Sequence, residues 1–450
     1  MTTRRTRRNF LSALGSTGVA TLAGCTGALD GGTDRPELDV AALREVEQLG
    51  SPAIPAQTPA PIAQTFLDHN ESRARELLDS VPESMSRSEV PNQAVRRIYA
   101  EAYEDATRRL ETARSERTLF EQVRSLRYAR GSAAMAKGTY DAAVGELSEG
   151  DVRSEVETVQ SAVASFRSAH RYLGDAPGPA LVVHADVEEF VDAATRYLGR
   201  TTETGRYAES APRVGEMLDG LESARASLEA ARHLSERYRD SLSDPQDFGD
   251  VFQESASWLV GVVEDRRDDY PDDYGPDSPL IDQFDRNLDD TPAEQLLAEA
   301  LAHVHFRTDG IREELRAGRI ASALLEVHVA ERNRRALESA IDAVRKGAFG
   351  APQSASAVRE TKLAALEAVE SARSSPVYPP VTRRALVNVS HRLGQGDSYL
   401  ERSLEYDTYR SARNAMGQYA YVQFVARETP ETSAWLLGVV NATRDESDES

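Results

Sequence analysis

Two long stretches of the chain contain no proline, residues 92–176 and 293–351. Proline interrupts helices, so these stretches can hold long ones. In these stretches, and also between Pro212 and Pro245, apolar residues recur at steps of three and four, as the helical repeat requires. The pattern is clear at Val159, Val163 and Phe166, at Leu221, Ala224, Leu228 and Leu234, and at Leu337, Ala340, Ile341 and Val344. No segment shows a convincing strand alternation. The sequence therefore predicts an all-α fold, either antiparallel helical bundles or a short α-solenoid of helical hairpins.

Local signals divide the chain into regions. Thr291 and Glu294 form a capping box with Pro292 at the first helical position, which predicts a helix beginning there. The stretch before it is rich in Asp, Pro and Gly, which predicts a linker loop over residues 268–290. We expect helical regions over residues 63–267 and 291–443, with an acidic tail at 444–450. The ordered part is larger than one simple bundle usually holds, which favours two bundles or a solenoid.

The first 24 residues have the composition of a secretory signal. Arg4, Arg5, Arg7 and Arg8 precede a short, weakly apolar run over residues 10–23, with no acidic residue among them. A basic start, a short apolar run and small residues before a cleavage site are typical of such signals. The apolar run is too short to span a bilayer, which needs about 20 residues.

The details of this signal resemble a known export route. Thr6-Arg7-Arg8-Asn9-Phe10-Leu11 resembles the twin-arginine signal, and Leu22-Ala23-Gly24-Cys25 resembles a lipobox. The resemblance implies cleavage after Gly24, a lipid on the Cys25 sulfur, and a protein anchored in the cell membrane that faces the outside. We expect residues 25–62 to form a flexible, proline-rich tether with a short helix over 38–49.

The net charge of the chain limits the kinds of partner that it can bind. Residues 1–24 contain four arginines and no acid, so a net charge of −21 becomes −21 − 4 = −25 after cleavage. Such acidity disfavours nucleic acid as a partner, because phosphates need a basic surface. Three lysines stand against fifty arginines among the 53 basic residues. In its acidity, lysine depletion and lipobox, the chain resembles exported lipoproteins of haloarchaea. The high salt in which these organisms live screens the repulsion between acidic side chains.

Cysteine use restricts the chemistry. Cys25 is the single cysteine of the chain. Once it carries a lipid, no thiol is left for a disulfide, a thiolate metal site or a cysteine nucleophile.

Three glycine-containing segments suggest helical hairpins. Residues 129–143 resemble the turn and flanking helices of a tetratricopeptide repeat, with Gly138-Thr139-Tyr140 as the turn. Gly205-Arg206-Tyr207 and residues 318–324 echo this pattern, although their spacing does not follow the 34-residue period. Ordinary hairpins with glycine turns are the alternative.

Two His–Glu pairs are candidate metal ligands. His233 with Glu236, and His328 with Glu331, each place both side chains on one helix face. Di-iron bundles use such pairs, and His328-Val329-Ala330-Glu331 is similar to the His-x-x-Glu of imelysin-type iron-capture lipoproteins, without the glycine that precedes it there. Exposed or capping histidines are the alternative, and we expect no bound cofactor.

Three sequons are candidate glycosylation sites at Asn70, Asn388 and Asn441. A cluster of aromatic residues lies near the C-terminus and predicts either core packing or a ligand groove: Tyr399, Tyr406, Tyr409, Tyr419, Tyr421 and Phe424.

No P-loop, Gly-x-Gly-x-x-Gly, Gly-x-Ser-x-Gly or His-Glu-x-x-His motif is present, so an enzyme is unsupported. The sequence favours a membrane-anchored, non-enzymatic module that binds an envelope protein or serves envelope assembly. The alternative is a lipoprotein that captures a solute or metal for a transporter.

Overall fold

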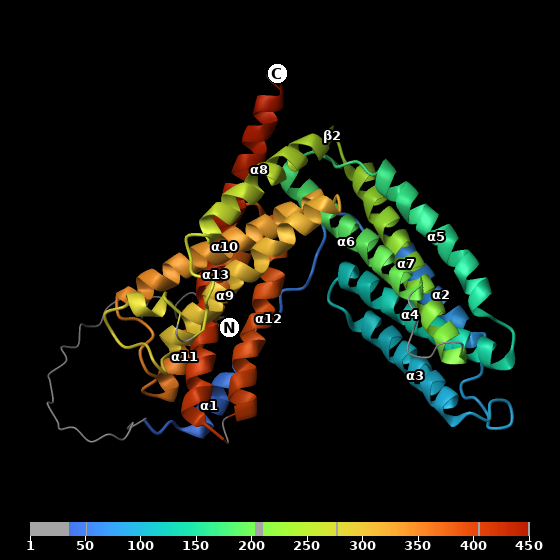
Figure 1. Cartoon of the computed structure of the whole chain (residues 1–450), viewed down its shortest axis with the longest axis horizontal. Helices are drawn as coiled ribbons and strands as arrows, with labels where there is room; N and C mark the ends of the chain where they lie inside the picture. Colours follow the sequence, from blue (N-terminus) through green and yellow to red (C-terminus); the bar gives the residue numbers. More distant parts are fainter. Residues whose placement is uncertain (1–35, 51, 203–209, 276–277, 404–405, 449–450) are drawn as a thin grey trace, which may run out of the picture. The chain divides into compact units, whose positions relative to one another are not determined.

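The computed structural model describes residues 36–50, 52–202, 210–275, 278–403 and 406–448. Thirteen α-helices and one pair of two-residue strands make up its regular structure in these ranges (Figure 1). The all-α prediction is confirmed. Cys25, Arg7 and Arg8 lie outside the described residues. No helix in the described part of the chain is both long enough and apolar enough to span a membrane.

The first group of helices centres on two long neighbours, α4 (Leu119–Val144) and α7 (Ala211–Ser241), which pack along each other (Figure 1). Around them lie α2 (Gln64–Asp79), α3 (Gln93–Ser115), α5 (Glu149–Ala169) and α6 (Pro177–Thr202). Ser148 and Asp151 form a reciprocal capping box that begins α5. Two short antiparallel strands, β1 (Leu173–Gly174) and β2 (Gln246–Asp247), join the loops that flank α6 and α7.

The second group contains α8 (Gly249–Arg267), α9 (Pro292–Arg316), α10 (Ile320–Arg345), α11 (Ala355–Arg373), α12 (Pro379–Ser403) and α13 (Thr408–Asp448). Helix α9 begins at Pro292 as predicted, because the Thr291 hydroxyl accepts the Glu294 amide. Between α8 and α9 lies the acidic loop, which contains a short 3₁₀ helix, η3 (Ile281–Gln283).

The buried apolar residues form two large clusters. The first contains residues that come before the acidic loop in the sequence and residues that come after it. It combines the helices before residue 268 with the start of α10 and the end of α13, through residues such as Leu324, Val327 and Leu436. The second contains α9, the later part of α10 and α11 to α13, together with α1 (Val40–Glu47). Tyr419, Tyr421 and Phe424 lie in this second core, as the packing alternative predicted, whereas Tyr406 of the same cluster is 87% exposed.

The prediction of a flexible tether is wrong for residues 37–50 and 52–62, which we call the N-terminal strap, whereas residues 25–35 lie outside the described part of the chain. Leu43 and Val46 of α1 are buried in the second core, and Ala56 and Ala60 are buried in the first. The Ala56 amide donates to Glu121 at 2.9 Å, and Thr118 donates to the Ala56 carbonyl at 2.6 Å. After α1 the proline-rich residues 52–62 form no regular structure, and Ala56 and Ala60 are the small apolar side chains that this segment buries.

One lysine fastens the beginning of this strap. Lys362 of α11 is fully buried, and its Nζ donates to the carbonyls of Val46 and Glu47 at 2.8 and 3.0 Å. The same nitrogen pairs with Asp397 of α12 at 2.7 Å. A cation at the carboxyl end of α1 satisfies its last carbonyls, so Lys362 acts as a cap supplied by another helix.

The turn predicted at Gly138-Thr139-Tyr140 is also wrong, because α4 runs unbroken through these residues. Gly138 instead lies against Gly215 of α7: a Cβ built on it would be 3.0 Å from the Gly215 Cα. The glycines permit a close helix contact rather than a turn. At Gly318 the prediction is right, because this residue has φ +71° in the turn between α9 and α10. Gly205–Tyr207 lies outside the described residues.

Candidate functional site

Buried polar groups gather where α6 meets the first turn of α10, a place we call the junction. Glu188 of α6 is 6% exposed. Its carboxylate accepts the amides of Ala321 and Ser322 at 3.0 and 2.7 Å, and the Tyr172 hydroxyl at 2.7 Å. Arg319, the residue before α10, provides no side-chain cap of its own. Glu188 therefore caps a helix that begins far away in the sequence.

Two histidines continue the polar cluster from the junction. The Leu173 carbonyl can only accept, so His184 donates to it through Nε2 at 2.8 Å. Nδ1 of a neutral His184 then accepts from His170 Nε2 at 3.1 Å. Burial lowers the pKa of His170 to about 3 and that of His184 to about 4, which keeps both rings neutral.

His170 lines two cavities. The first, of about 170 Å³, is lined by Phe166, His170, Tyr172, Glu188 and Ile320. The second, of about 240 Å³, is lined by His170, His184, Glu236, Tyr238 and Arg239. In the described structure His170 Nδ1 is buried and has no hydrogen-bond partner.

A third cavity, of about 220 Å³, shares Arg319 with the first and has charged walls. We call it the arginine cavity. Its lining comes from α6, α9, α10 and α12 and includes Glu189, Asp192, Glu314, Arg319, Ser322, Glu326, Arg384 and Asn388. Leu325 and Val329 supply apolar surface, and the lining holds no aromatic side chain apart from His328.

Two arginines organise the charges of this cavity. Arg319 pairs with Asp192 at 2.9 Å and with both carboxylate oxygens of Glu314. Arg384 pairs with Glu189 at 3.0 Å and lies 3.5 Å from Asp186. Arg319 lies between carboxylates of α6 and α9, and Arg384 lies against two carboxylates of α6. The lining holds two guanidiniums and four carboxylates, so its charged groups are predominantly acidic.

Asp186 lies behind Arg384 and is fully buried. Neither of its carboxylate oxygens makes a hydrogen bond of normal geometry to a described residue. Burial raises the pKa of Asp186 to about 6, although Arg384 acts in the opposite direction. Thr58 of the N-terminal strap lies close to this carboxylate, so the strap covers the back of the cavity wall.

The His328–Glu331 pair does not form a metal site. Glu331 is fully buried and pairs with Arg334 and Arg335 at 2.8 Å and with Arg266 at 2.9 Å. Hydrogen bonds from Arg334 and Arg335 outweigh burial and lower its pKa to about 2. His328 Nε2 instead lies 3.0 Å from the Ser433 hydroxyl. The two side chains have different partners, although His328 reaches the wall of the arginine cavity.

The second pair is also separated. His233 stacks on Phe66 with ring centroids 4.2 Å apart, and its Nε2 accepts the Ala63 amide at 3.2 Å. Glu236 is exposed. Over the described residues, no three His, Cys, Asp or Glu side chains gather as a metal site requires.

The sequons differ in exposure. Asn70 is 4% exposed, donates to the Phe66 carbonyl at 2.8 Å and accepts from Arg130 at 2.7 Å. These contacts exclude Asn70 as a glycosylation site in the folded chain, which corrects that prediction. Asn388 is exposed and Asn441 is half-buried.

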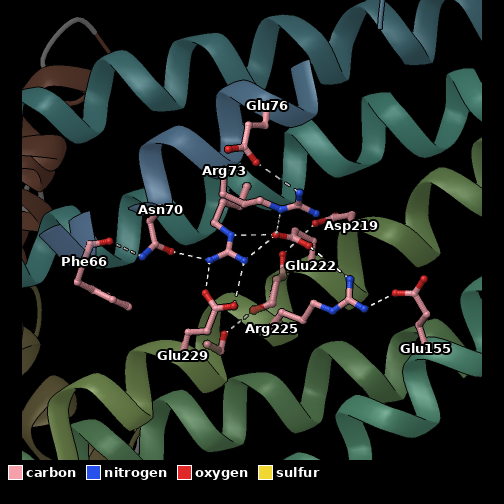
Figure 2. Close-up of polar contacts among 12 residues, drawn as sticks. Phe66, Asn70, Arg73, Glu76, Glu155, Asp219, Glu222, Arg225 and Glu229 are labelled. Carbon is pink, nitrogen blue, oxygen red and sulfur yellow. Dashed lines mark hydrogen bonds and ion pairs between the residues drawn. The ribbon is translucent and has the colours of Figure 1, made fainter. Parts of the chain in front are cut away.

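Figure 2 shows the ion network to which Asn70 belongs. Arg130 of α4 is 2% exposed and donates to Glu222 of α7 at 2.6 and 3.0 Å and to Glu229. Arg73 of α2 adds a bond to Glu222 at 3.2 Å. Arg130 and Arg73 together lower the pKa of Glu222 despite its burial. The network joins three helices and leaves no buried charge uncompensated, so we assign it a structural role.

Acid should destabilise the protein through its buried histidines. His170, His184 and His328 have pKa values of about 3, 4 and 3 in the fold, against 6.5 when exposed. Below pH 6.5 the unfolded chain binds more protons, so stability falls by up to ~1.4 kcal/mol per pH unit for each histidine. Burial raises the pKa values of Asp186, Glu188 and Asp219, which opposes this fall, and it lowers the pKa of His233, which adds to it. The thermal midpoint in multimolar KCl should drop steadily between pH 7 and 5; a flat midpoint would contradict the neutral histidines.

Sequence reasoning did not select Glu188, His184, Arg319 or Arg384. A signal was nevertheless present, because His184, Asp186 and Glu188 interrupt the apolar stretch of residues 180–191. Buried polar groups in such a stretch need partners. Those of Glu188 and Asp186 lie in α10 and α12, and those of His184 are His170 and Leu173.

Two family models match the chain. Residues 65–244 match a domain of unknown function (DUF8262), and residues 249–438 match another domain of unknown function (DUF8264). No curated protein and no solved structure matches the chain. Glu188 lies in the first matched segment and the helix it caps lies in the second, so the junction connects the two segments.

Proposed function

We propose that this chain is a lipid-anchored helical binding protein that holds a small polar solute at the outer face of the cell membrane. The arginine cavity is the observation that carries the proposal. It has a volume of about 220 Å³ and a charged lining, and Asp186, a buried carboxyl group with a raised pKa, lies next to Arg384 in its wall. These are features of ligand sites. The residues around Cys25 support the anchor.

The anchor is tested by Cys25→Ser. We expect the wild-type protein in the membrane fraction, and the variant either released into the medium or retained as an unprocessed precursor. A lipid contributes about 0.8 kcal/mol per buried methylene, so its loss should change the distribution completely. Thr26→Ser is the matched control and should leave the protein in the membrane. A Cys25→Ser protein that stayed membrane-bound at mature size would refute the anchor.

The binding role is tested separately from the anchor. Purified mature protein in multimolar KCl should be dialysed against a small-molecule extract of the envelope, and retained solutes identified by mass spectrometry. Reproducible enrichment of a solute supports the proposal, and enrichment of none contradicts it.

A second candidate is a protein-interaction or envelope module. It is favoured by large aromatic side chains on the surface, since Trp258 is 58% exposed and Phe306 is 64% exposed. Replacing both by serine should abolish co-purification of an envelope protein if this candidate is right, and leave solute binding unchanged.

A further inference from the structure

The arginine cavity has features that select among polar solutes. Its two arginines are each held by carboxylates: Arg319 by Asp192 and Glu314, and Arg384 by Glu189 with Asp186 behind it. Arg124 also pairs with Glu189, and Arg196 with Asp192 at 2.9 Å. Arg124 and Arg196 do not line the cavity, whose lining offers two guanidiniums for an anionic group and four carboxylates for a cationic one.

Single ions fit this wall poorly. A bare anion at Arg384 would have to displace Glu189, and a bare cation at Glu189 would have to displace Arg384. Either exchange leaves a half-buried charge without its partner, which is costly. A zwitterion avoids this cost, because its carboxylate can face a guanidinium while its ammonium faces a carboxylate.

The neutral part of the lining narrows the choice further. Ser322 and Asn388 offer hydroxyl and amide groups for hydrogen bonds, and Leu325 and Val329 offer a small apolar surface. Quaternary ammonium groups are usually bound by cages of Trp, Tyr or Phe, and none of these lines the cavity. The walls favour an ammonium with N–H donors and a short side chain.

We propose that the arginine cavity binds a small zwitterion with a primary ammonium and a carboxylate, in chemical terms a free amino acid with a short side chain. This inference rests on the proposed solute-binding function and specifies the solute class. Arg384 receives the carboxylate, the carboxylates of α6 and α10 face the ammonium, and Leu325 and Val329 contact the side chain.

The test measures binding of glycine and L-alanine to the full mature protein in multimolar KCl, by equilibrium dialysis with labelled solute. Glycine betaine, acetate and methylamine are the comparison probes. We expect L-alanine to bind at least tenfold more tightly than each of them, a difference of ~1.4 kcal/mol or more. Betaine has the same two charges without N–H donors, while acetate and methylamine each carry one half of the zwitterion.

Two variants locate the binding in the cavity. Ala385→Leu fills the cavity without changing charge, and Arg384→Lys keeps the charge but loses the planar guanidinium. Each should weaken L-alanine binding at least tenfold, whereas Ala442→Leu, at an exposed position of α13, should leave it unchanged. Thermal midpoints without solute show whether each variant is folded. Ala385→Leu keeps every charged group of the wall. It therefore still tests whether L-alanine binds in this cavity if Arg384→Lys fails to fold.

The outcomes separate the inference from the proposed function. Equal binding of betaine and L-alanine, or wild-type binding by folded Ala385→Leu, would overturn the zwitterion assignment. No binding of either amino acid would overturn it as well. Retention of a different solute from the envelope extract would then leave the proposed function standing, and retention of none would remove both.

Discussion

Replacing Arg130 by methionine should lower the free energy of unfolding by about 3–5 kcal/mol. Its guanidinium lies 2.6 Å from Glu222, and both side chains are 2% exposed. Methionine has a similar reach but no charge, so Glu222 would keep a buried carboxylate with only the more distant partners Arg73 and Arg225. Asn70 and Glu229 would lose a donor at the same time. Denaturant unfolding at constant high salt measures the change.

Two control variants distinguish the effect of leaving a buried charge unpaired from the effect of removing one positive charge. Arg153 lies on α5 with its side chain 67% exposed and pairs with Glu149 at 3.1 Å. Arg153→Met removes the same charge and should cost less than about 1 kcal/mol. The double variant Arg130→Met with Glu222→Met should recover part of the loss, because no buried charge is left unpaired. An Arg130→Met protein as stable as Arg153→Met would contradict the structural role of the network.

Replacing Gly215 by leucine should cost about 3 kcal/mol or more and separate α4 from α7. A Cβ at Gly215 would lie 2.8 Å from the Met135 carbonyl oxygen and would overlap the Thr139 hydroxyl. The carbonyl belongs to the helix backbone and cannot rotate away, so the helices have to move apart. A drop in the thermal midpoint, with helical content largely kept in circular dichroism, is the expected result.

Gly261→Leu is the matched control, because a Cβ on Gly261 of α8 would meet no atom within 4 Å. Leucine is a better helix former than glycine, so this variant should be as stable as the wild type or up to about 1 kcal/mol more stable. Equal stability of the two variants would show that α4 and α7 do not need a close contact.

Features that depend on neighbouring residues could be predicted from the sequence. Thr291 caps the beginning of α9 as predicted, although Glu294 accepts the Asp290 amide rather than completing the capping box. The spacing of Val159 and Val163 placed them on the buried face of α5. The glycine at 318 marked a real turn. In each case the atoms that decide the structure lie within a few residues of one another.

Features that depend on distant residues were missed or misread. Gly138 has the same local sequence signal as a turn, but Gly215 of α7 decides its role. The strap has the composition of a flexible spacer, and only Glu121, Thr118 and Lys362 make it a packed element. Asn70 matches a sequon, yet Arg130, sixty residues later, holds its side chain. No local pattern contains these partners.

The candidate site could not be predicted from the sequence for the same reason. The polar residues of α6 could have been noticed, but their meaning depends on the first turn of α10 and on Arg384 of α12. A sequence window shows that Glu188 needs a partner and cannot show that two backbone amides 133 and 134 residues later supply it.

The Glu188 cap also has a consequence for how such a chain can change over generations. A recombination event that moved residues 249–438 to another chain would leave the amides of Ala321 and Ser322 without their acceptor. The donor chain would in turn keep a buried carboxylate that had lost both amides. Each unsatisfied group costs roughly 1–3 kcal/mol, a large share of the stability of a typical protein. We therefore expect the two matched segments to be inherited side by side, and any lineage that separates them to carry a compensating change at position 188.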